Sequence, residues 1–224
     1  MTIDPHEKLS LLKLYSDRLA QYGPTIAALG WTKPKARLRF RVLLEYWLST
    51  PPARPLRVLD FGCGFGDLFG YAQDRNVPID YTGLDINSDL IRVARKRYPT
   101  ARFLCADIFE QPLDEKFDIV LSSGAHNYLL SNNLKFIERS FELFRDMSEF
   151  GFAVNFLSDR VNYRNEQNYY SAPETILSLA LRYTSRVTLR HDYMPFEFTV
   201  FVDKRAEIDE NLNVFLPFVA DCTG

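Results

Sequence analysis

The sequence predicts an α/β fold in which helices cover both faces of an open, doubly wound sheet. Two observations carry this prediction. Residues 58–68 have the pattern of a buried strand that breaks into a glycine-rich turn and then a helix. Two further predicted strands end at or just before an acidic residue, Asp85 and Asp107, and open α/β sheets collect their ligands at the carboxyl ends of strands. A chain of 224 residues, 46% of them hydrophobic, is long enough for one such domain with its own core.

Two helices are expected before the glycine-rich turn. Apolar residues recur at helical spacing over 9–22, and the dipeptide Gly23-Pro24 ends this first helix. The second begins at Pro34, a favourable first-turn residue, and ends before Pro51-Pro52.

Four side chains of this amino-terminal region are candidates for ligand contact: Tyr15, Tyr22, Trp31 and Arg39. Tyr22 and Trp31 are assigned to the substrate, while the Arg39 guanidinium could pair with the carboxylate of a cofactor. The alternative is that they only pack in the core or face solvent.

The glycine-rich turn follows Asp60, the last polar residue of the first strand. Its glycines let the backbone turn tightly and approach a ligand where any Cβ would collide. Asp60, Gly62, Cys63 and Gly64 are therefore candidate cofactor contacts. The turn alone is ambiguous, because it could hold the pyrophosphate of a dinucleotide, hold the methionine part of S-adenosylmethionine, or have no ligand.

The acids at the next two strand ends distinguish these possibilities. Asp85 could accept hydrogen bonds from both ribose hydroxyls of an adenosine, as an acid does in NAD-binding folds. Asp107, after the strand 101–105, could accept from the exocyclic amine of adenine, with Ile86 and Ile108 on either side of the ring. A dinucleotide site does not require that second acid.

The strand 117–123 is expected to be buried and to run into a polar, aromatic loop where the reaction could occur. Ser123 is a candidate cofactor contact and Asn127 a candidate substrate contact. His126 in this loop and His191 at the end of a later strand are the candidate general bases, since histidine titrates near neutral pH. A structural histidine is the alternative for each, and the reaction can proceed without a base.

A helix over 134–147 is expected to lead into a strand over 150–157 that is buried on both faces. Residues 158–170 are polar and rich in tyrosine, which suits a lid or pocket wall. Tyr163 and Arg164 are its candidate substrate contacts. A solvated loop without function has the same composition.

The remaining segment supplies a helix, two strands and a tail. Residues 171–174, Ser-Ala-Pro-Glu, have the pattern of a capping box at a helix start. Strands are expected at 185–191 and 196–202. The apolar run 214–219 implies that the tail docks on its own domain or on a second subunit.

With the turn 60–66 as its first motif and Asp85 and Asp107 as the ribose and adenine acids, the chain resembles the class I S-adenosylmethionine-dependent methyltransferases. The resemblance implies a Rossmann-like, seven-stranded sheet whose last strand is antiparallel and forms a hairpin with the sixth. It also implies S-adenosylmethionine as the cofactor.

The resemblance covers residues 56–203, the expected cofactor-binding domain. Residues 1–55 are then a helical extension that caps the active site, and residues 204–224 are a carboxyl-terminal tail. The acceptor is expected to be small or medium-sized, a metabolite or a peptide. Transfer to oxygen and to nitrogen are both open, with a carboxylate, a phenol or an amine as the nucleophile.

Two other functions are compatible with the sequence. A protein that binds S-adenosylmethionine without catalysis could act as a partner or regulatory subunit. A NAD-dependent oxidoreductase is the second alternative, and Asp107 and the terminal hairpin argue against it.

Composition excludes several classes of function. A formal net charge of −2 and a pI near 6 provide no basic face for nucleic acid. The asparagine-proline-proline-aromatic motif of amino-directed nucleic-acid methyltransferases is also missing after the fourth strand. Cys63, Cys105 and Cys222 lack metal-ligand spacing, so no metal is expected and a reducing compartment is favoured. Without a signal peptide or a long apolar run, a cytoplasmic monomer or homodimer with no membrane partner is expected.

Overall fold

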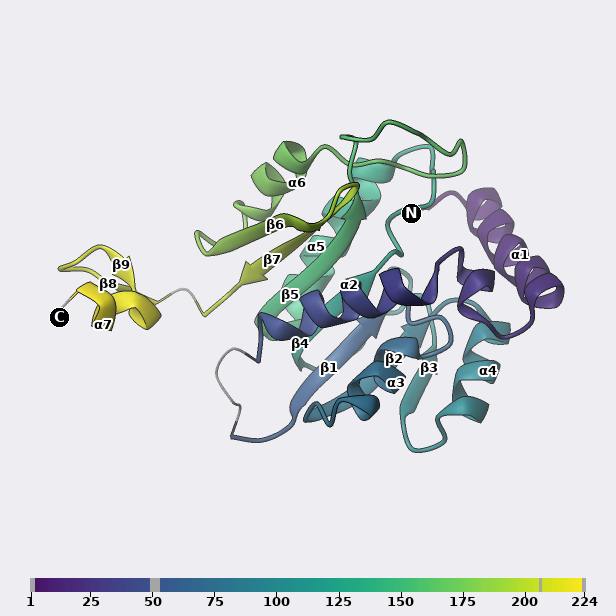
Figure 1. Ribbon diagram of the computed structural model, residues 1–224, viewed down its shortest axis with the longest axis horizontal. Coiled ribbons are helices and arrows are strands. Elements are labelled where there is room, and N and C mark those ends of the chain that lie inside the picture. Colours follow the sequence, from purple (N-terminus) through teal and green to yellow (C-terminus); the bar gives the residue numbers. More distant parts are fainter. Residues whose placement is uncertain (1–2, 49–52, 206, 223–224) are drawn as a thin grey trace.

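A seven-stranded sheet forms the centre of the molecule in the computed structural model, which describes residues 3–48, 53–205 and 207–222 (Figure 1). The strands lie in the order β3-β2-β1-β4-β5-β7-β6. Their bounds are β1 (Leu56–Phe61), β2 (Ile79–Asp85), β3 (Arg102–Cys105), β4 (Phe117–Ser123), β5 (Ser148–Leu157), β6 (Val187–Met194) and β7 (Glu197–Asp203).

Helices cover both faces of this sheet, with α2, α3 and α4 on one face and α5 and α6 on the other. The helical segments of the domain are α1 (Pro5–Tyr22), the short 3-10 helix η1 (Ile26–Leu29), α2 (Lys33–Glu45), α3 (Asp67–Asp74), α4 (Ser88–Arg97), α5 (Asn133–Met147) and α6 (Pro173–Ala180).

The directions of the strands confirm the predicted fold. Strands β1 to β5 pair in parallel, whereas β7 runs antiparallel to both β5 and β6. Val200 of β7 pairs with Val154 on one side and with Leu189 on the other. The antiparallel last strand and its hairpin with the sixth are therefore as expected. The carboxyl ends of β1 to β5 share one edge of the sheet, which is where the polar residues gather.

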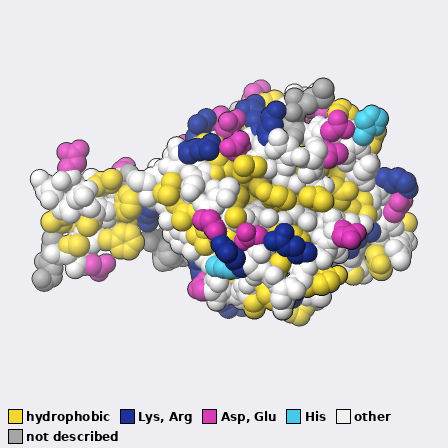
Figure 2. All heavy atoms as spheres, turned by 90° about the horizontal axis from the view of Figure 1, so that it is seen from above, with side chains coloured by type: hydrophobic (Ala, Val, Ile, Leu, Met, Phe, Trp, Pro, Cys, Tyr) yellow, Lys and Arg dark blue, Asp and Glu magenta, His cyan; other side chains and the backbone are white. Residues whose placement is uncertain are grey.

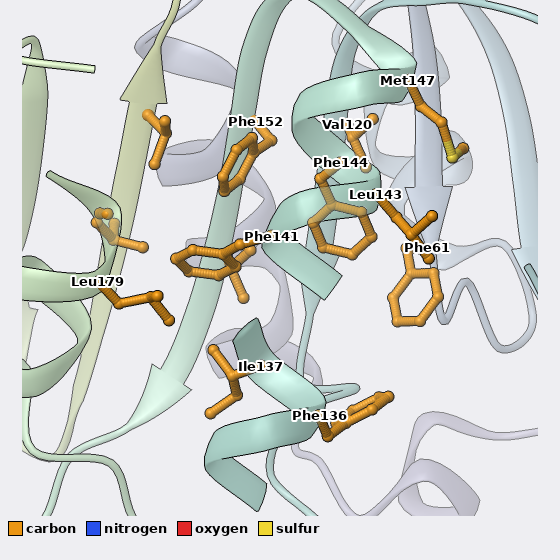
Figure 3. Close-up of a cluster of buried hydrophobic side chains, with 14 of the residues drawn as sticks. Phe61, Val120, Phe136, Ile137, Phe141, Leu143, Phe144, Met147, Phe152 and Leu179 are labelled. Atoms are coloured by element: carbon orange, nitrogen blue, oxygen red, sulfur yellow. The ribbon is translucent and has the colours of Figure 1, made fainter. Parts of the chain in front are cut away.

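The core on the α5 side is rich in phenylalanine (Figure 3). Phe144 packs edge-on against Phe61 of β1 with ring centroids 5.0 Å apart, and Phe141 packs likewise against Phe152 of β5 at 4.9 Å. Burying each such ring contributes about 3–5 kcal/mol relative to alanine. This packing holds α5 against β1 and β5.

The predicted capping box at the start of α6 is wrong. The N-cap residue is Ala172, whose side chain cannot accept a hydrogen bond, and Pro173 occupies the first turn. Ser171 is buried instead, and its N–H donates to the carbonyl of Leu157 at 2.8 Å. The serine thus ties the loop to the end of β5 rather than capping a helix.

A buried ion pair joins α2 to the far end of the sheet. The Arg39 guanidinium donates through Nε and Nη2 to the two carboxylate oxygens of Glu197, the first residue of β7. The side chains are 1% and 6% exposed. Asn155 of β5 also donates to Glu197, at 3.3 Å. Charges removed from water in this way are tolerated only when each is paired and hydrogen-bonded.

The tail forms a small unit of its own, made of β8 (Ile208–Asp209), β9 (Val214–Phe215), the 3-10 helix η2 (Leu216–Phe218) and α7 (Val219–Cys222). It projects from the domain, at the left of Figures 1 and 2. Its large apolar side chains include the exposed Ile208, Leu212, Leu216 and Phe218. These exposed side chains therefore do not dock on the core of the domain, which was one of the two arrangements expected for the tail.

The buried ion pair generates a test of stability. Glu197→Gln should lower the free energy of unfolding by about 3 kcal/mol, because it leaves the Arg39 charge buried without a counter-ion. Denaturant unfolding measures this. The control is Asp17→Asn, which breaks the exposed Lys13–Asp17 pair on α1 and should leave the transition midpoint in place. Equal effects of the two substitutions would contradict the assignment of the buried pair as a structural tie.

Candidate functional site

A cavity lies at the carboxyl ends of β1 to β4. Its floor is the turn 62–64 and the strand ends at Asp85 and Asp107, and one wall is the segment 123–125 after β4. Side chains from α1, η1 and α2 form the remaining walls. We call this space the central cavity.

The glycine turn has the backbone that only glycine adopts without strain. Gly62, Gly64 and Gly66 have φ values of +72°, +55° and +75°. A Cβ on Gly62 would lie 2.6 Å from the Cβ of Ala125, and one on Gly64 would lie 2.9 Å from a methyl group of Leu29. The turn therefore packs directly against Ala125 and Leu29 and has no room for a side chain at either glycine.

Asp85 links this turn to the end of β2. Its two carboxylate oxygens accept one backbone hydrogen bond each, from the N–H of Gly64 at 3.0 Å and from that of Asn87 at 2.9 Å. Burial raises the pKa of Asp85, and these backbone donors oppose the rise. Each carboxylate oxygen retains a second lone pair, so Asp85 can still accept from a pair of ribose hydroxyls.

Asp60 lies beneath the turn and faces the same cavity. It accepts a hydrogen bond from the Tyr81 hydroxyl at 2.7 Å. Burial raises the pKa of Asp60 to about 7, and the nearby charges of Asp85 and Asp67 add to this rise against the Tyr81 hydrogen bond. A cationic ligand would favour the ionised form of this acid.

Asp107 lies at the opposite end of the cavity, with one oxygen accepting from the N–H of Phe109 at 3.0 Å. Of the two isoleucines predicted to lie on either side of the adenine ring, only one lines the cavity. Ile86 lines the cavity, but Ile108 is fully buried in the α5-side core, and Ala106 and Phe109 line the cavity in its place.

The structure corrects the expectation that His126 faces the acceptor. Ser123 lines the cavity, but His126 is fully buried and lies outside its lining. Rings of Phe136 and Phe156 lie 5.1 and 5.6 Å from the imidazole. Burial lowers the pKa of His126 to about 3, so the ring stays neutral and has no path to a ligand. It packs in the core.

The other candidate base is equally remote. His191 lies on β6, the edge strand, with its ring 6.0 Å from that of Phe198. It is not among the described residues that line the cavity. The structure therefore brings neither predicted base to the site.

Four of the five predicted substrate contacts also lie outside the lining. Asn127 is buried and accepts a hydrogen bond from the N–H of Leu157 at 3.1 Å, which makes it a tie between two loops. Tyr22 and Tyr163 are exposed, and Arg164 stacks on Tyr170 at the surface. The loop 158–170 does not contribute to the cavity wall, so its prediction as a pocket wall is not supported.

Trp31 and Arg39 do line the cavity. The guanidinium carbon of Arg39 lies 3.6 Å from the centre of the Trp31 ring, which packs against Gly124. Because Nε and one N–H of Nη2 pair with Glu197, the two N–H groups of Nη1 and the second N–H of Nη2 remain for the predicted contact with a cofactor carboxylate.

Sequence reasoning missed most of the contribution of α1. Leu11, Leu12 and Tyr15 line the cavity from this helix, and Tyr128 and Phe109 line it from the loops. Burial and the charge of Asp85 raise the pKa of the Tyr15 phenol. The apolar spacing of α1 was visible in the sequence, but nothing local showed which surface its apolar face would cover.

Comparison with known proteins agrees with this geometry. Residues 58–146 match the model of a family described as a methyltransferase domain. A protein of Mycobacterium tuberculosis named as a methyltransferase is 33% identical over 163 residues, which cover 68% of this chain and 95% of the relative. The chain belongs to the class I S-adenosylmethionine-dependent methyltransferases.

Methyltransferases of known structure have the same fold as this chain. The TehB-like enzyme of Corynebacterium glutamicum has a TM-score of 0.59 at 22% identity, covering 85% of this chain and 98% of that one. The plantazolicin methyltransferase BpumL, solved with S-adenosylhomocysteine, has a TM-score of 0.63 at 15% identity, covering 87% and 95%. The cofactor of this methyltransferase is S-adenosylmethionine, and the glycine turn and strand-end acids fit it. Within the described ranges, no helix is both long and apolar enough to cross a membrane.

The glycine turn generates a binding prediction. Gly62→Ala should weaken binding of S-adenosylhomocysteine by at least about tenfold, because the new methyl group collides with Ala125 of the cavity wall and strains a left-handed position. Isothermal calorimetry measures the affinity, and circular dichroism checks that the fold persists. Native affinity in a folded variant would show that this turn does not approach the cofactor.

The raised pKa of Asp60 generates a pH prediction. Between an unfolded pKa near 4 and a folded pKa near 7, the folded chain holds a proton that the unfolded chain has lost. The free energy of unfolding should therefore fall as the pH rises through this window, by up to about 4 kcal/mol from this group. Asp60→Asn should lack this component in urea titrations across the window. Parallel pH profiles of the two proteins would refute the shift.

Proposed function

We propose that this methyltransferase transfers a methyl group to an oxygen of a small or medium-sized, largely apolar acceptor, with a carboxylate as the preferred nucleophile. The observation that carries the proposal is a largely apolar cavity that none of the three histidines lines. Bound S-adenosylmethionine supplies an electrophilic methyl group, so the protein has mainly to align the reactants.

The residues on the floor of the cavity would hold the cofactor. Asp85 accepts from the ribose hydroxyls and Asp107 from the adenine amine, since both carboxylates have lone pairs left. Asp60 and the glycine turn receive the methionine part, whose ammonium group suits a neighbouring carboxylate. Nη1 of Arg39 donates to the methionine carboxylate.

The side chains on the remaining walls of the cavity determine which class of acceptor can bind. Trp31, Phe40 and Tyr128 supply aromatic surface, and α1 closes the cavity on one side. Such walls favour an apolar body that enters the cavity over a folded protein or a nucleic acid. The one guanidinium in the lining is already neutralised by Glu197, so it offers hydrogen bonds rather than net charge.

A carboxylate nucleophile suits this site because it needs no histidine to act as a base. A carboxylic acid is already ionised at neutral pH and can attack directly, whereas a phenol or an ammonium must first lose a proton. The name of one relative supports this choice. A fatty-acid O-methyltransferase of Mycolicibacterium smegmatis is 41% identical over 76 residues, which cover 32% of this chain and 28% of that enzyme.

A matched acceptor panel tests the proposal. Octanoate, octylamine and an alkylphenol are offered with methyl-labelled S-adenosylmethionine, and release of S-adenosylhomocysteine is followed. We expect turnover with the carboxylate and a product whose label is released by mild alkali, as from a methyl ester. With cofactor saturating, kcat should change by no more than about twofold between pH 6 and pH 8, because no base titrates.

His191→Gln is the control, since its ring lies outside the cavity and the variant should keep the native rate. Alkali-stable product from the amine or the phenol would assign a different nucleophile. A kcat that rises with pH through the range in which histidine titrates would indicate a general base. If that rise were absent in His191→Gln, the base would be His191.

A further inference from the structure

Helix α1 crosses the cavity above the two strand-end acids. Lys8, Leu12 and Tyr15 recur at helical spacing and share one face of this helix. Lys8 Nζ lies 2.5 Å from an oxygen of Asp107. Seven residues further along, Tyr15 lines the cavity near Asp85. One helix face thus reaches both acids that are expected to hold the nucleoside.

Several polar contacts attach α1 to the rest of the domain. None of its residues is fully buried. The carbonyl of Leu12 accepts from the side-chain amide of Asn87 at 3.0 Å, and the Ser16 hydroxyl donates to Asp89 at 2.9 Å. Near its start, Glu7 accepts two hydrogen bonds from Ser131, at 2.6 and 3.0 Å. Further along the helix, Tyr15 and Leu19 pack against the cluster of Ala28, Phe65 and Leu90. The position of the amino-terminal end of α1 therefore depends on the polar contacts and on Lys8.

The geometry allows α1 to move as a unit. Gly23 follows the helix with a φ of +65°, and no atom lies within 4 Å of where its Cβ would be. A single unconstrained left-handed residue at a helix end is a position where a hinge can absorb a change of backbone angle. Besides η1, where Arg18 donates to the carbonyl of Ala27 at 3.3 Å, α1 contacts segments 87–89, 107–110 and 131. Asn87 and Asp107 line the cavity, so movement of the amino-terminal end of α1 away from them would open it.

We propose that α1 is a latch over the cofactor and that Lys8 is its positioning residue, which holds the helix closed through Asp107 and orients that carboxylate toward adenine. The inference rests on the proposed role of Asp107 in binding the adenine amine. Lys8 also pairs with Glu110 at 2.8 Å, which fixes the ammonium between two acids. The Asp107 oxygens have enough lone pairs to accept from Phe109, Lys8 and adenine together.

The test is the dissociation rate of two ligands, S-adenosylhomocysteine and methylthioadenosine, which share the nucleoside and differ in the amino-acid part. In Lys8→Met, both ligands should dissociate about three- to fivefold faster, because the lost ion pair is partly exposed. The native rate should rise with ionic strength and the variant rate should rise less. Lys8→Arg, which keeps the charge, should restore most of the native rate.

Lys13→Met is the matched control. Lys13 lies on the exposed side of the same helix and pairs with Asp17 at 2.8 Å, so its removal should leave both rates unchanged. Native dissociation rates in Lys8→Met, or the same acceleration in Lys13→Met, would overturn the latch. A native protein that binds neither ligand would instead refute the proposed cofactor site, which keeps the two failures distinct.

Discussion

The turn between β1 and α3 is the constraint on which the rest of the site depends. Its left-handed glycines turn the chain from the sheet edge into a helix while leaving no side chain over Ala125 or Leu29. The N–H of Gly64 then binds Asp85, so the same turn sets the distance between the ends of β1 and β2. Without side chains of their own, these glycines let the backbone itself line the cavity.

The charges around the central cavity are strongly asymmetric. Asp60, Asp85 and Asp107 face it, with Lys8 paired to Asp107, while the guanidinium of Arg39 is neutralised by buried Glu197. Such a field favours a sulfonium over the uncharged thioether that remains after methyl transfer, which assists release of the product. Burial and the nearby carboxylates raise the pKa of Asp60. Ionising this acid therefore costs stability unless a cationic ligand is bound.

Local signals in the sequence were enough to predict the glycine turn and the strand-end acids, because each depends on a few adjacent residues. The seven-stranded sheet with its antiparallel last strand was expected from the family resemblance instead. Side-chain burial depends on distant packing and was predicted less well. His126 and Ile108 follow strands as expected, but the rings of α5 and its neighbours enclose them. The pairing of Lys8 with Asp107 joins residues far apart in the chain, and no local pattern announces it.

The most direct test of the account is a calorimetric titration of S-adenosylmethionine and S-adenosylhomocysteine into the native protein and into Asp85→Ala, with NAD as the control ligand. The account predicts binding of both cofactor forms, no binding of NAD, and a loss of at least about tenfold in affinity when the Asp85 carboxylate is removed. No binding of either cofactor form, tighter binding of NAD, or full affinity in Asp85→Ala would contradict it.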